Sequence, residues 1–138
     1  MKAFETLKES EISSRSLQLT AVFAVLDSQL SKVAKYSDNW DSYGAPAPAV
    51  SALDLTRHLL QAARLNLVEP TTVVASAEGG VATYFIRGRK ICYIEYQNSG
   101  EGVLGMYGDQ VPTAIVEIAT DHQSTTEALK QIREYFLP

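Results

Sequence analysis

The feature that most constrains this fold is a pair of β-rich runs separated by only two residues. Val81–Arg87 and Lys90–Gln97 are rich in β-branched and aromatic residues, and Gly88-Arg89 alone connects them. A connection this short can join only antiparallel strands, and glycine at its first position fits a type II′ turn. The sequence therefore predicts a β-hairpin near the middle of the chain.

Further short segments of the same kind extend this hairpin on both sides. Thr71–Ser76 precedes it across the turn Glu78-Gly79-Gly80, and Val103–Tyr107 and Thr113–Thr120 follow it. Sequential strands with tight turns are typical of an antiparallel meander. We expect a sheet of about five strands.

The chain before and after the meander has the periodicity of helices. Apolar residues recur every three or four positions from about Ser16 to Tyr36 and again from Pro48 to about Leu67, whereas residues 1–15 form a polar lead-in. At the other end, Ser124-Thr125-Thr126-Glu127 matches a capping box and predicts a C-terminal helix. The apolar positions expected in the helices are Leu19, Val22, Phe23, Leu26, Leu30, Val33, Leu53, Leu59, Leu60, Ala63, Leu67, Leu129, Ile132 and Phe136.

The order of elements indicates the fold class. Two helices, a run of strands and one helix do not alternate as βαβ units would, so they predict a two-layer α+β domain. The length of 138 residues fits one domain spanning residues 1–138.

Composition limits the location and the partners of the chain. Cys92 is the only cysteine, which excludes an internal disulfide and a multi-cysteine zinc site and favours a reducing, cytoplasmic location. Residues 1–15 have no basic region followed by an apolar core, and no apolar run approaches the length of a membrane span, so we expect neither a signal peptide nor a membrane span. With 12 basic and 16 acidic residues the formal net charge is −4, which argues against nucleic acid as a partner.

The motifs that resemble cofactor or metal sites lack the context that such sites need. Gly100–Gly105 matches G-x-G-x-x-G, but Gly108 and Pro112 follow it where a dinucleotide site requires a long helix. His58 and His122 have no second ligand at metal-binding spacing. We expect no cofactor, no metal and no catalytic residue.

The strands carry the more interesting candidates, Tyr84, Tyr93, Glu95 and Tyr107. Strand alternation places Ile91, Tyr93 and Glu95 on one face. This group could form a protein-binding surface, because interfaces favour tyrosine. It could instead line a ligand pocket between the sheet and the helices. An enzyme that uses Glu95 or Glu78 as an acid or base is a third possibility.

Single-stranded nucleic acid is a further alternative for the same sheet. Arg87, Arg89 and Lys90 crowd one hairpin beside strand tyrosines that include Tyr96. Bases stack on aromatic rings while cations hold phosphates. The acidic net charge argues against this alternative.

The segment Asn39-Trp40-Asp41-Ser42-Tyr43-Gly44 is the most distinctive string of the chain. Asp41 can accept hydrogen bonds from nearby backbone amides, and Gly44 can take a positive φ. We expect a rigid joint between the first two helices, with Trp40 and Tyr43 packed on the sheet. The alternative is an exposed aromatic anchor for another protein.

This segment, with Ala45, the following helix and Ser76-Ala77-Glu78-Gly79-Gly80-Val81, resembles an uncharacterised family of small bacterial proteins. Its pattern is W-D-[GS]-Y-G-A, a helix, and an acidic-Gly turn that opens a β-meander. The resemblance covers about Ser37 to Tyr107. It implies a bacterial origin and the same domain bounds, and it transfers no site residue.

The absence of a catalytic constellation predicts a non-enzymatic interaction module, an adaptor or accessory protein. Its partner would be another protein, or a second copy in a homodimer formed through the sheet. An open sheet edge could also pair with a partner strand. The alternative function is a small-ligand-binding domain with a pocket between sheet and helices.

Overall fold

The computed structural model describes residues 2–109 and 111–138, with side chains from residue 14 onward. It contains three helices and one five-stranded sheet, which confirms the predicted α+β class. In chain order the elements are α1 (Lys2–Val33), α2 (Val50–Leu65), β1 (Thr72–Ala75), β2 (Gly80–Arg87), β3 (Lys90–Gln97), β4 (Gly102–Gly108), β5 (Val111–Ile118) and α3 (His122–Phe136).

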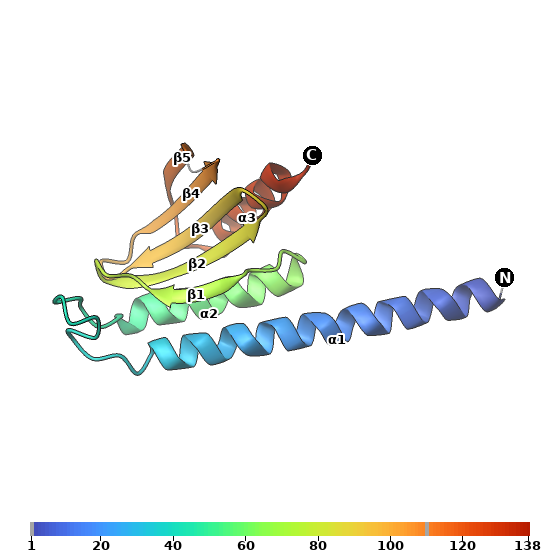
Figure 1. Ribbon diagram of the computed structural model, residues 1–138, viewed down its shortest axis with the longest axis horizontal. Coiled ribbons are helices and arrows are strands. Elements are labelled where there is room, and N and C mark those ends of the chain that lie inside the picture. Colours follow the sequence, from blue (N-terminus) through green and yellow to red (C-terminus); the bar gives the residue numbers. More distant parts are fainter. Residues whose placement is uncertain (1, 110) are drawn as a thin grey trace.

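The sheet is the predicted meander, with strand order β1-β2-β3-β4-β5 and every neighbour antiparallel (Figure 1). Arg87 pairs with Lys90 across the predicted hairpin. Gly88 has φ of 60°, as the first central residue of a type II′ turn requires. The short turns thus fix the order of the strands.

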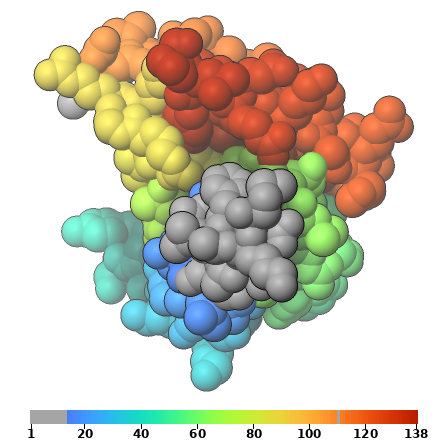
Figure 2. Space-filling model, turned by 90° about the vertical axis from the view of Figure 1, so that its right-hand side faces the viewer, coloured from blue at the N-terminus to red at the C-terminus, as the bar shows by residue number. Residues whose placement is uncertain are grey.

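The helices pack on one face of this sheet. α2 contacts the middle strands β2 and β3, α1 lies along β1 and α2, and α3 contacts α2 and β5. Seen from the end, α3 (red) lies above α2 (green), and α1 (blue) lies below (Figure 2). Among the described residues, none of the helices combines the length and apolar character needed to cross a membrane.

The core lies between the helices and the inner face of the sheet, and it contains most of the residues that the periodicity indicated on the three helices. Leu19, Val22 and Phe136 are partly buried against it, and Leu67 lies outside it. Alternate residues of the central strands complete it. Its strand members include Val81, Phe85, Cys92, Ile94, Tyr96 and Leu104, and its helix members include Phe23, Leu26, Leu30, Val33, Leu53, Leu59, Leu60, Ala63, Leu129 and Ile132.

Two helix starts differ from the prediction. α1 begins at Lys2 rather than near Ser16, so the lead-in expected for residues 1–15 is helical from Lys2. This stretch holds no Gly or Pro, and a helix needs no apolar stripe to continue. α3 begins at His122, because the Asp121 carboxylate accepts hydrogen bonds from the amide and hydroxyl of Ser124 at 2.8 Å each. Asp121 is thus the N-cap, and the predicted capping box is wrong.

The end of α2 is also earlier than predicted. The Asn66 side chain donates to the Ala62 carbonyl at 2.7 Å, and Leu67 then takes a φ of 56°. This reversal leaves Leu67 57% exposed and places Val68 in the core instead. The heptad pattern failed at Leu67 because the helix ends at Leu65, two residues before the pattern ends.

Cys92 is fully buried in this core, so its thiol is not accessible to reagents. Its pKa is raised to about 11, because the effect of burial outweighs the opposite effect of the Lys90 charge. Because the thiolate is the reactive form, we expect no reaction with a thiol reagent such as DTNB at pH 8 in the folded protein and one thiol per chain in urea. Complete labelling of the folded protein within minutes would contradict this packing.

Candidate protein-binding surface

Strand pairing divides the residues of the sheet between two faces. Phe85 and Cys92 pair across β2 and β3, are buried, and face the helices. Tyr84 and Tyr93 pair one position further along the two strands, so they face the opposite side. They are half-buried on a face that no helix covers among the described residues. We call this side the open face.

Three tyrosines cross the open face as a row of touching rings, which we call the tyrosine ladder. The ring centroids of Tyr84 and Tyr93 are 5.6 Å apart, and those of Tyr93 and Tyr107 are 6.0 Å apart. These distances are those of favourable aromatic pairs. Cross-strand contact of this kind holds each ring in place before any partner arrives.

Gly105 provides the space in which the middle ring of the ladder lies. Tyr93 pairs with Gly105 across β3 and β4, and a Cβ on this glycine would lie 2.2 Å from the Cε1 of Tyr93. The ring therefore rests directly on the backbone of β4. The sequence places Gly105 in a strand but gives no sign that an aromatic ring covers it.

Two carboxylates lie in the next row of the same face. Glu95 pairs with Val103 across β3 and β4, and Val103 pairs with Glu117 across β4 and β5. The one hydrogen-bond partner described for Glu95 is the side-chain amide of Gln97, at 3.5 Å. Its described contacts show no hydrogen-bonded pair of Glu95 with a nucleophile or with Glu117, so they add no support to Glu95 as a catalytic residue. Glu78 is exposed in the turn before β2.

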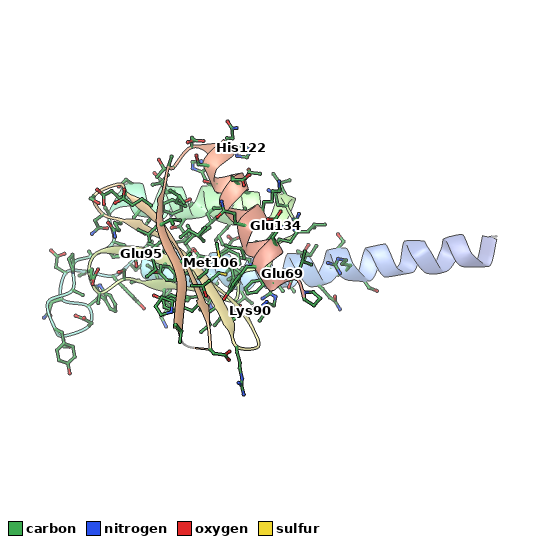
Figure 3. The ribbon with its side chains drawn as sticks, turned by 90° about the horizontal axis from the view of Figure 1, so that it is seen from above. Glu69, Lys90, Glu95, Met106, His122 and Glu134 are labelled. Carbon is green, nitrogen blue, oxygen red and sulfur yellow. The ribbon has the colours of Figure 1, made fainter. Side chains whose placement is uncertain are left out.

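Two of the three cations of the β2–β3 hairpin, Arg87 and Lys90, point away from the open face. Arg87 donates to the Glu69 carbonyl at 2.7 Å, and Lys90 donates to the Tyr135 carbonyl at 2.8 Å, both on the helix side. Lys90 and Glu95 lie toward opposite ends of β3 (Figure 3). Arg87 and Lys90 are the only basic residues within the five strands. The open face is therefore acidic.

This arrangement argues against the nucleic-acid alternative. Arg87 and Lys90 lie on the helix side of the sheet, opposite the tyrosine ladder. Tyr96 is buried against α3, where its hydroxyl is 3.3 Å from that of Thr125. Arg89 is exposed in the turn, 3.4 Å from the Asp109 carboxylate. Bases stacked on the ladder would meet carboxylates instead of cations.

The ligand pocket expected between the sheet and the helices cannot be formed by the residues predicted to line it. Tyr84, Tyr93, Glu95 and Tyr107 all face away from the helices, so they cannot line a pocket between sheet and helices. The reason is the strand alternation itself. Buried Phe85, Cys92 and Ile94 occupy the inner face that such a pocket would need.

The hydroxyls of Tyr84 and Tyr93 stay protonated at neutral pH, because the pKa of each is raised. Burial is the main cause that raises the pKa of Tyr93 to about 12, and hydrogen bonding and charge from Tyr107 and the charge of Glu95 add to it. Burial and the charge of Glu95 also raise the pKa of Tyr84. Both hydroxyls therefore remain hydrogen-bond donors for a partner.

The Trp40 segment forms the rigid joint that the sequence predicts, although one of its aromatics does not pack. The Asp41 carboxylate accepts from the amides of Tyr43 and Ala45 at 2.9 and 3.0 Å, which lowers the pKa of Asp41. Trp40 is half-buried, stacks on Tyr36 at 5.1 Å, and donates its indole N–H to the Pro46 carbonyl at 3.0 Å.

Tyr43, in contrast, is 92% exposed, so its expected packing on the sheet is wrong. The two hydrogen bonds to Asp41 turn the backbone at Ser42 to a φ of 66° and direct Tyr43 outward. It belongs to the loop between α1 and α2 and not to the strands that carry the tyrosine ladder.

The two histidines lie closer together than the sequence indicates. His58 of α2 and His122 at the start of α3 are both exposed and line one groove of about 290 Å³ between these helices. Within the described part of the chain, no three His, Cys, Asp or Glu side chains gather as a metal site would need. Gly100 lies in the β3–β4 turn and Gly105 within β4, so the glycine motif leads into a strand and not a helix.

Comparison of the chain with protein-family models, curated proteins and solved structures gives no match. The resemblance to small bacterial W-D-[GS]-Y-G-A proteins therefore stays a prediction. The open face, with its ladder and its carboxylates, is the candidate site that the geometry supports best.

Proposed function

We propose that this chain is a non-enzymatic adaptor or accessory module of the bacterial cytoplasm that binds another protein through its open face. The partner presents an apolar surface bordered by Lys or Arg. The observation that carries this proposal is the tyrosine ladder, whose middle ring packs on Gly105. The row of Glu95 and Glu117 lies next to it, and the strands place no basic residue on this face.

The tyrosine ladder suits protein binding for a physical reason. Tyrosine offers a large apolar ring and a polar hydroxyl, and it loses little conformational entropy on binding because it has few rotatable bonds. Here the rings already contact one another. Apolar side chains continue the surface around the ladder, with Ile86 and Val74 about two-fifths exposed and Ile115 54% exposed.

The carboxylates decide which kind of partner fits. Glu95 and Glu117 lie within one row, and the strands place no cation on their face. A second copy facing this surface would bring the same two carboxylates, and like charges across an interface are unfavourable. A different protein with Lys or Arg at this border would pair with them, so we favour it over a homodimer.

The test is capture of a partner from source cells followed by reconstitution with the purified captured protein. We expect the Tyr93→Ala variant to weaken binding by about tenfold or more, because truncating a central interface aromatic typically costs more than 1 kcal/mol. The matched control is Tyr43→Ala, which removes an exposed tyrosine outside the open face. Affinity is measured by calorimetry at two salt concentrations.

Three results would speak against this proposal. The first is capture that Tyr93→Ala leaves unchanged, and the second is affinity that a Glu95→Gln, Glu117→Gln double variant leaves unchanged at low salt. The third is a stable dimer in light scattering that Tyr93→Ala dissociates, because it would make a second copy the occupant of the open face.

A further inference from the structure

The two edges of the sheet differ in how their backbone groups are satisfied. At the β1 edge, the Gln29 side chain of α1 accepts from the Val73 amide at 2.9 Å, so a helix covers this edge. At the β5 edge, no described segment pairs with the outer side of the strand. An uncovered edge is a template for an additional strand.

The hairpin geometry shows which groups of β5 point outward. In a two-residue hairpin the closing pair, here Arg87 and Lys90, exchanges backbone hydrogen bonds. From this pair onward, successive residues of a strand direct their N–H and C=O groups alternately to the neighbouring strand on one side and on the other. The amide of Gln97, which donates to Glu101 at 2.8 Å, agrees with this alternation. Ile115 and Glu117 of β5 therefore direct their N–H and C=O groups away from β4.

Only the first half of this edge carries the features that normally block strand addition. A proline and a bulge are such features, and here Pro112 lies directly before the irregularity in pairing between β4 and β5. The half from Ile115 onward has neither, and no lysine protects it. Its side chains are unusually apolar for an edge, with Ile115 54% and Val116 45% exposed.

We propose that the partner adds an extended segment to β5 as a sixth strand, hydrogen-bonded to Ile115 and Glu117, with Lys or Arg on the open-face side beside Glu117 and apolar residues on the helix side beside Val116. This rests on the proposed function and specifies how the partner binds. The added strand would continue the open face beyond the tyrosine ladder, so one partner could contact both.

Charge again selects a different protein over a second copy. Glu117 is the only charged residue of β5. A second β5 strand would therefore offer no cation to Glu117, whereas a segment with alternating basic and apolar residues would.

The probe for this proposal is a capped eight-residue peptide that alternates Lys with Val, titrated into the isotope-labelled full chain. We expect the amides of Ile115 and Glu117 to shift and to gain protection from hydrogen exchange. A peptide with Glu in place of Lys should bind at least about tenfold more weakly. A peptide whose amides facing β5 are N-methylated should not bind, because it cannot donate hydrogen bonds to this strand. This comparison needs no variant of the chain, so it does not depend on whether a variant folds.

An Ile115→Pro variant isolates the backbone contribution. It removes an outward N–H that no strand of the sheet uses, and Ile115→Ala is the control that loses the side chain but keeps this N–H. We expect Ile115→Pro to abolish peptide binding and Ile115→Ala to weaken it a few-fold. The same pair of variants is then applied to the captured partner.

The outcomes separate this inference from the proposed function. Partner binding that needs Tyr93 but ignores Ile115→Pro would overturn strand addition and leave the open-face proposal intact. Equal binding of the Lys and Glu peptides, or of the N-methylated peptide, would also overturn it. A homodimer that Ile115→Pro dissociates would assign the edge to a second copy instead.

Discussion

Replacing Gly80 by alanine is expected to lower the free energy of unfolding by at least about 3 kcal/mol. Gly80 has a φ of 138°, a conformation that side chains rarely adopt, and an added Cβ would lie 2.3 Å from the carbonyl oxygen of Tyr96. The obstacle is backbone of the paired strand β3, so it cannot move without breaking the pairing of β2 and β3. Urea denaturation of both proteins measures the difference.

Gly88→Ala is the matched control for this substitution. Gly88 also has a positive φ, of 60°, but no heavy atom lies within 4 Å of its added Cβ. Alanine there meets only the cost of the left-handed backbone, about 1–2 kcal/mol. If the two variants lost similar amounts of the free energy of unfolding, the close contact between Gly80 and the backbone of β3 would be contradicted.

The contrast between these two glycines illustrates what a sequence can and cannot predict. The Gly88 turn was predictable, because two residues between two strands leave few backbone conformations. Gly80 was recognisable only as part of a turn, because its close contact is with Tyr96 on another strand. A contact of that kind depends on the register between strands.

The same division holds for the candidate site. Alternation along β3 predicted that Tyr93 and Glu95 share a face, because it is local to one strand. It could not say that this face is the open one, which depends on where the helices pack. It also could not place Gly105 under Tyr93 or Glu117 in line with Glu95, since both depend on how β4 and β5 pair with their neighbours.

Helix bounds failed for reasons of local chemistry. The capping box at Ser124 is a plausible helix start, but the Asp121 carboxylate lies three residues earlier and accepts from the Ser124 amide and hydroxyl.

The exposure of Tyr43 has a similar local cause, the two hydrogen bonds that Asp41 accepts from the amides of Tyr43 and Ala45. Such competition between neighbouring polar side chains is hard to rank from sequence, because each candidate contributes a similar energy, on the order of 1 kcal/mol.

Two neighbouring residues of β2 allow the assignment of the faces to be tested directly. Phe85 is fully buried against the helices, and Tyr84 lies on the open face. We expect Phe85→Ala to lower the free energy of unfolding by about 3–5 kcal/mol, because it leaves a large cavity in a close-packed core. Tyr84→Ala should cost less, about 2 kcal/mol, because its side chain is only partly buried and its ring contact with Tyr93 adds to the area that it buries. Chemical denaturation measures both.

The reverse order is expected for partner binding. Tyr84→Ala should weaken it by about tenfold, because the first ring of the ladder is lost. A folded Phe85→Leu variant, which keeps the open face, should bind as the wild type does. If Tyr84→Ala instead destabilises the chain as much as Phe85→Ala, the tyrosine ladder is structural. Stability alone would then explain the three aromatic rings on the uncovered face, and the proposed function would lose the observation on which it rests.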